Sequence, residues 1–250
     1  MHPIRRMFWV PWRRAIADLQ QGFEGVLDSG RPFPVSFALV AAAVIVTWVL
    51  YVPVHELLHA AGCHLTGCRV EELQIGRWYG GALLARVFPF VVAGGPYAGR
   101  LSGFDTGGSD GSYLATVAMP YLLTILGGHL LLRVAARRGS VVPFAVGLVL
   151  MTAPVLGLIG DYYEMGSVLV SAALKHSAFL CRLGDPMALR SDDVIALIGR
   201  FPVLFPEGRG VWAAAVACAW AVGWLLASLT FEGSSLLAGM ALRRKARAER

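Results

Sequence analysis

Charged residues are scarce in this sequence. Asp, Glu, Lys and Arg make up 15% of the 250 residues, whereas hydrophobic residues make up 56%. Soluble globular domains carry roughly 25% charged residues. The apolar residues here also lie in long uninterrupted runs, which are typical of membrane-spanning helices and not of a soluble core. This pattern excludes an ordinary soluble domain.

Acidic residues are the scarcer of the two signs, so the chain has a formal net charge of +6. The basic residues gather near the two ends of the chain and in the short turn Arg133–Arg138, and no stripe interleaves basic with aromatic residues. Membrane topology and contact with anionic lipid explain this distribution better than nucleic acid does. We therefore expect the lipid bilayer as a partner and no nucleic acid.

The sequence has no internal repeat, no low-complexity linker and no clean signal peptide. Met1–Leu27 mixes four arginines with Trp and Phe and lacks a compact apolar run before a cleavage site. It is interpreted as a cytoplasmic tail or as an amphipathic segment on the bilayer surface. The four cysteines form no close CxxC pair, but Cys63, Cys68 or Cys181 could join a disulfide in an oxidising compartment.

Four apolar stretches are long enough to cross a membrane. Val35–Val54 has no charge, and its roughly 20 residues cover about 30 Å at about 1.5 Å per residue. We therefore predict an all-α polytopic membrane protein with about four transmembrane helices. The predicted spans cover about residues 34–62, 113–134, 141–159 and 211–229.

The segments between these spans are expected to differ in structure. Arg69–Ile75 and the apolar but glycine-rich and proline-containing residues 80–99 predict a small β-strand or hairpin element between the first two spans. The third span is expected to break near Gly160-Asp161, and residues 175–210 are interpreted as a long loop.

The predicted organisation is one membrane-embedded zinc metalloprotease domain over residues 34–242. It is preceded by the cytoplasmic or amphipathic segment 1–33 and followed by a basic tail, 243–250. Four spans place both termini on one side, together with 13 of the 22 basic residues. The positive-inside rule then puts the termini in the cytoplasm. We expect an integral protein of a bacterial inner or cell membrane, of unknown oligomeric state.

The chemistry is carried by the pentapeptide His55-Glu56-Leu57-Leu58-His59 near the far end of the first span. Histidines four residues apart lie on one face of a helix, where both imidazoles can bind one zinc ion. Glu56, turned about 100° around the helix, would act as the general base and later hand the proton to the leaving group. Ionisable residues at membrane depth are functional by default.

A catalytic zinc needs a third protein ligand and one open position. Asp161 is the first candidate, because it follows a glycine at the end of an apolar span. Glu164 and His129 are alternatives, His129 also as a residue that lines the site or orients a ligand. Asp161 could instead cap the helical segment that begins at Tyr162.

The stretch from His55 to Ala85 resembles the site-2 protease family of intramembrane zinc metalloproteases. The histidine-glutamate motif is followed by Gly67 and Val70 and then by Gly80-Gly81, in the order typical of that family. Further on, Ala118-Met119-Pro120 is similar to the family's Gly-Pro turn. The family's aspartate ligand corresponds to Asp161, although Tyr162 stands here where the family has glycine.

The resemblance implies a zinc metalloendopeptidase that cleaves a transmembrane or membrane-anchored protein within the bilayer. Arg69–Ile75 and residues 80–99 are expected to offer a strand edge to the unwound substrate. Known family members hold their zinc nearer the cytoplasmic face, whereas the charge count places the motif of this chain nearer the other face.

Two other functions use the same residues. A zinc-dependent membrane hydrolase or acyltransferase could act on lipid or lipoprotein with the same ligands. A non-enzymatic metal-binding or transport protein would need ionisable residues along one path through several spans, whereas here they lie on the first and third spans, with His129 on the second.

Overall fold

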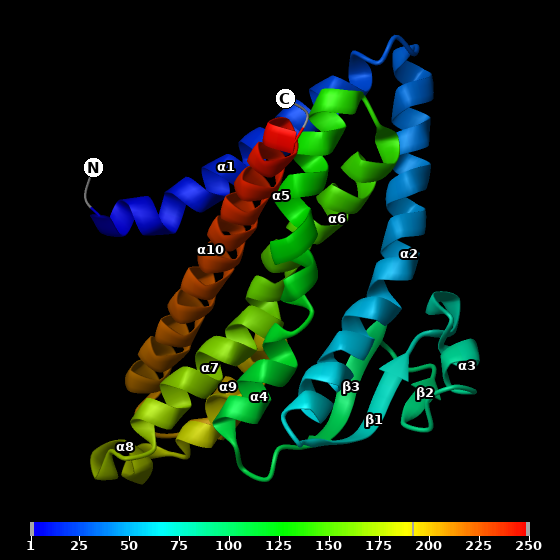
Figure 1. Cartoon of the computed structure of the whole chain (residues 1–250). Coiled ribbons are helices and arrows are strands. Elements are labelled where there is room, and N and C mark those ends of the chain that lie inside the picture. The colour runs from blue at the N-terminus through cyan, green and yellow to red at the C-terminus, as the bar shows by residue number, and fades with distance from the viewer. Residues whose placement is uncertain (1–2, 192, 249–250) are drawn as a thin grey trace. The chain divides into compact units, whose positions relative to one another are not determined.

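The computed structural model describes residues 3–191 and 193–248, and most of them are helical (Figure 1). Among these residues, four helical segments are long and apolar enough to cross a membrane, in agreement with the number of spans predicted from hydropathy. A three-stranded sheet between the first two also agrees with the prediction. The four segments are Phe33–Leu65, Asp110–Arg138, Val141–Ile159 and Arg209–Arg244.

The chain divides into two compact units. The first runs to Ala153 and resumes at Thr230, and the second covers Pro154–Leu229. The elements that begin before Ala153 are α1 (Pro3–Leu27), α2 (Phe33–Leu65), β1 (Arg69–Ile75), η1 (Arg77–Tyr79), α3 (Gly81–Leu84), β2 (Val91–Ala93), β3 (Gly99–Asp105), α4 (Asp110–Ala118), α5 (Tyr121–Arg138) and α6 (Val141–Leu156). The remaining elements are η2 (Gly157–Ile159), α7 (Asp161–Leu174), α8 (Ala178–Leu183), η3 (Pro186–Leu189), α9 (Val194–Leu204) and α10 (Arg209–Ala248).

In the first unit, α1 lies along α5 (Figure 1). Gly25 permits this close approach, because a Cβ there would lie 2.6 Å from the carbonyl oxygen of Ala136. Asp18 accepts hydrogen bonds from His129 at 2.6 Å and from Arg133 at 2.7 Å. The N-terminal segment is therefore a docked helix over Pro3–Leu27.

Helix α2 runs without interruption through Pro53. Only 17% of its most apolar stretch is buried inside the protein. Ile45 and Leu50, for example, expose 65% and 63% of their surface. An apolar surface of this extent is expected to face lipid.

The small sheet packs against the far half of α2 (Figure 1). Its strand order is β2-β1-β3, with β1 parallel to β2 and antiparallel to β3. Leu73 and Ile75 of β1 are fully buried against the helix. The sequence predicted Arg69–Ile75 as an edge strand, but this strand is central, and β2 and β3 are the outer strands.

The third span is interrupted where the sequence predicted. The α-helical part of α6 ends at Leu156, η2 follows, and α7 begins at Asp161 directly after Gly160. Asp161 is therefore the first residue of a helix.

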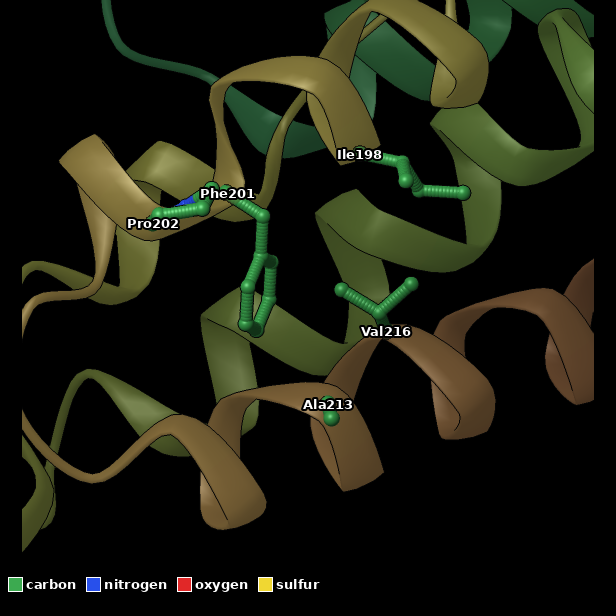
Figure 2. Close-up of a pocket in the computed structure, with 5 residues that line it drawn as sticks. All are labelled: Ile198, Phe201, Pro202, Ala213 and Val216. Atoms are coloured by element: carbon green, nitrogen blue, oxygen red, sulfur yellow. The ribbon is translucent and has the colours of Figure 1, made fainter.

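In the second unit, residues 175–210 are not the long loop that the sequence suggested. They hold α8, η3 and α9, because Ser177, Asp185 and Asp193 each accept a hydrogen bond from a backbone N–H at a helix start. A pocket of about 300 Å³ lies between α9 and α10, lined by Ile198, Phe201, Pro202, Ala213 and Val216 (Figure 2).

Candidate metal centre

Two imidazole rings converge on one face of α2. The Nε2 atoms of His55 and His59 lie 3.1 Å apart, and the ring planes are nearly perpendicular at 84°. A tetrahedral zinc with bonds of about 2.0–2.1 Å holds two ligand nitrogens about 3.3 Å apart. The two nitrogens are thus close to the separation that a shared metal ion requires.

The opposite nitrogen of each ring is held by a neighbour. The Nδ1 of His55 lies 2.8 Å from the hydroxyl of Tyr51, and the Nδ1 of His59 lies 2.9 Å from the carbonyl oxygen of Thr116 in α4. The carbonyl can only accept, so His59 carries its proton on Nδ1, and its Nε2, which faces the Nε2 of His55, is the nitrogen that could bind a metal. Metal-binding histidines commonly have their second nitrogen fixed in this way.

Glu56 directly follows His55 in the sequence. Its side chain is buried, and 9% of the surface of the residue is exposed. Gly99, the first residue of β3, lies directly against its side chain. A Cβ at this position would overlap the Cγ of Glu56 and lie 2.9 Å from its Oε1. The outer strand β3 therefore confines the carboxylate.

Asp161 supplies the third group. One ligand atom each from His55, His59 and Asp161 lies within 4.8 Å of the other two, so the three residues could hold a metal ion. His59 is buried and the other two are half-buried. Two imidazoles and one carboxylate form a donor set found in catalytic zinc sites that keep a fourth position open.

The other candidates are not members of this group within the described part of the chain. His129 lies fully buried on α5, where its Nδ1 pairs with Asp18. Glu164 is buried one turn beyond Asp161 in α7. His64 is exposed at the end of α2 and contacts the ring of Phe90.

The pocket between α9 and α10 offers no comparable chemistry. Its five lining residues are all apolar, so none can bind a metal or move a proton (Figure 2). The residues that could hold a metal ion lie instead around the two histidines of α2.

Sequence reasoning missed three residues of this site. Tyr51 could have been found, because it precedes His55 by four residues and so lies on the same helix face. Thr116 acts through its backbone carbonyl, which no side-chain pattern reveals. Gly99 is one of 29 glycines, and only its place beside Glu56 distinguishes it.

Comparison with known proteins adds no family assignment: no family model, no curated protein and no solved structure matches this chain.

Proposed function

We propose that this chain is an intramembrane zinc metalloprotease that cleaves a transmembrane or membrane-anchored protein. The proposal is carried by one observation, the convergence of His55, His59 and Asp161 on one point. The burial of Glu56 next to the first of these residues supports it further.

Each residue has a separate task in this proposal. His55 and His59 would hold zinc through Nε2, and Asp161 through a carboxylate oxygen. When bound, zinc would lower the pKa of its water and polarise the scissile carbonyl. Glu56 would accept the proton of the attacking water and return it to the leaving amine. Tyr51 and Thr116 would keep the imidazoles turned toward the metal.

The sheet suggests how a substrate would be presented. A peptide bond inside a helix is shielded, so the substrate must be unwound before it is cut. The strand order leaves β2 and β3 outermost, and β3 begins against Glu56. A substrate segment that pairs with an outer strand would reach the site as an extended chain.

The decisive experiment compares zinc content with cleavage of a membrane-anchored reporter in the purified full chain. Glu56→Gln should retain zinc and lose cleavage, because the amide keeps the shape of the carboxylate but accepts no proton. Glu71→Gln is the matched control, since Glu71 is exposed on β1 and should cleave like the wild type. Unchanged cleavage by Glu56→Gln would refute the proposed role.

The ligands are tested in the same assay. His59→Ala and Asp161→Ala should lose zinc, whereas His64→Ala, which removes an exposed histidine at the end of the same helix, should keep it. Absence of zinc from the wild type, or full zinc content in both ligand variants, would refute the metal site.

A further inference from the structure

A disulfide lies next to the metal centre. It joins Cys63, which follows His59 by four residues on α2, to Cys68, which directly precedes β1, with the two Cα atoms 4.8 Å apart. Both residues are buried, with 0% and 6% of their surface exposed. The Cα separation is within the usual range for a disulfide and requires no backbone movement. The bond fastens the sheet to the far end of α2.

From this bond we infer that the metal centre faces an oxidising, extracytoplasmic compartment. The cytosol keeps thiols reduced, so a disulfide of this kind forms on the other side of the membrane. Its formation breaks two S–H bonds and makes one S–S bond. The two electrons and two protons pass to the disulfide of an oxidoreductase in that compartment, which becomes a dithiol.

The length of α2 places the same end on the far side of the bilayer. His55 follows Phe33 by 22 residues, which is about 33 Å at about 1.5 Å per residue. This distance is close to the roughly 30 Å of the hydrocarbon core. The beginning of α2 and the histidine pair therefore lie near opposite membrane surfaces.

The basic residues identify which surface is cytoplasmic. Gly139 follows Arg137 and Arg138 at the end of α5 and lies close to Ser29, in the connection between α1 and α2. The start of α2 therefore shares its end of the unit with a short, exposed basic turn. Basic residues in short turns favour the cytoplasmic side. Charge distribution and disulfide thus agree on the orientation.

This orientation also determines which part of a substrate could reach the site, a conclusion that rests on the proposed function. A site at the outer surface would meet the extracytoplasmic end of a membrane anchor, where an exported protein joins its transmembrane segment. This is the opposite side from that implied by the family resemblance.

The redox state is tested in intact cells that express the full chain with Cys181→Ser and Cys218→Ser, which remove the two free thiols. Thiols are blocked with N-ethylmaleimide before lysis, and the chain is then denatured, divided into two samples and treated with polyethylene-glycol maleimide. We expect no added polymer without reduction and two additions after reduction. With the blocking step omitted, a Cys63→Ser control should gain one polymer without reduction. If the parent chain gains two polymers when neither blocking nor reduction is used, both cysteines are free thiols and the inference is overturned.

The orientation is tested by adding one exposed cysteine to the same background. Ser109→Cys lies before α4 on the side of the sheet, and Asp28→Cys lies in the turn between α1 and α2. A membrane-impermeant maleimide should label Ser109→Cys in intact cells and Asp28→Cys only after permeabilisation. The reverse pattern would overturn the inference. Neither assay uses zinc or cleavage, so a failure here leaves the proposed function standing.

Discussion

At the scale of single residues, the site depends on groups that do no chemistry themselves. Tyr51 and the Thr116 carbonyl each contact the nitrogen that faces away from the other imidazole. Gly99 limits where the carboxylate of Glu56 can lie. Since misplacement of a reacting group by about 1 Å can cost about 100-fold in rate, such contacts would determine the proposed activity as strongly as the proposed ligands would.

Gly99→Ala is expected to separate positioning from metal binding. The added methyl group would overlap the side chain of Glu56 and displace it, whereas His55 and His59 would stay in place. We expect kcat for reporter cleavage to fall about 100-fold with zinc content unchanged. The measurement is a kcat and KM determination alongside metal analysis.

Gly111→Ala provides the matched control for this substitution. A Cβ at Gly111 would meet only Ser109 Oγ at 3.8 Å, an ordinary contact, so activity should stay near that of the wild type. Wild-type kcat in Gly99→Ala would show that β3 does not position the base.

The sequence was sufficient to identify the chemical groups but not their neighbours. His55 and His59 follow from their spacing on one helix, and Asp161 from an acid after a glycine in an apolar segment, whereas the role of Glu56 stays a prediction. Thr116 lies 57 residues from its partner and contributes a backbone atom. Its role depends on how α4 packs against α2, which no local pattern specifies.

At the scale of elements, α1 forms ion pairs through Asp18 and through Arg14, and the two sites differ in burial. The pair of Asp18 with Arg133 leaves 12% and 25% of the two side chains exposed, and His129 joins it with none exposed. The pair of Arg14 with Glu232 leaves 47% and 34% exposed. Removing one partner of a buried ion pair lowers the stability of the fold more than removing one partner of an exposed pair, because the remaining charge stays unpaired away from water.

Removal of the two pairs should therefore have unequal effects on stability. Asp18→Asn should lower the free energy of unfolding by roughly 1.5–3 kcal/mol, the usual worth of hydrogen bonds to charged groups. Arg14→Gln should cost less than about 1 kcal/mol, because an exposed pair is screened by solvent. Thermal unfolding of both variants in the same detergent measures the difference. Equal shifts in Tm would contradict the assignment of Asp18 as the anchor of α1.

The same pair predicts a dependence on pH. Burial alone would raise the pKa of Asp18, but hydrogen bonds and charge from His129 and Arg133 outweigh it and hold the pKa below the ordinary value. The folded pKa is the lower one, so Asp18 contributes stability above its unfolded pKa and loses it as pH falls through the folded value. Tm of the wild type should fall toward that of Asp18→Asn below about pH 4.

Helices and strands could be predicted from the sequence where the pattern that specifies them lies within the segment itself. Four spans follow from hydropathy, and Arg69–Ile75 was identified as a strand from its residues. The central position of that strand depends on β2, a partner of three residues that carries no distinct pattern. The helices within residues 175–210 begin at polar capping residues that also occur in ordinary loops.

At the scale of the whole molecule, folding and metal binding are expected to be linked. The proposed ligands come from positions 55, 59 and 161, so the site exists only when the chain is folded. A ligand that binds only the folded state stabilises it by about 2.7 kcal/mol at 100 times its Kd. For a chain of this size that corresponds to a rise in Tm of about 5–10 °C.

We therefore expect zinc to raise the Tm of the chelator-treated wild type by several degrees, as measured by thermal unfolding in detergent. Glu56→Gln and His64→Ala should keep this rise, because neither removes a proposed ligand. His59→Ala and Asp161→Ala should abolish it. An undiminished rise in Asp161→Ala alone would mean that the two histidines bind zinc without this carboxylate. Because the assay needs no substrate, it tests the metal site even while the natural substrate is unidentified.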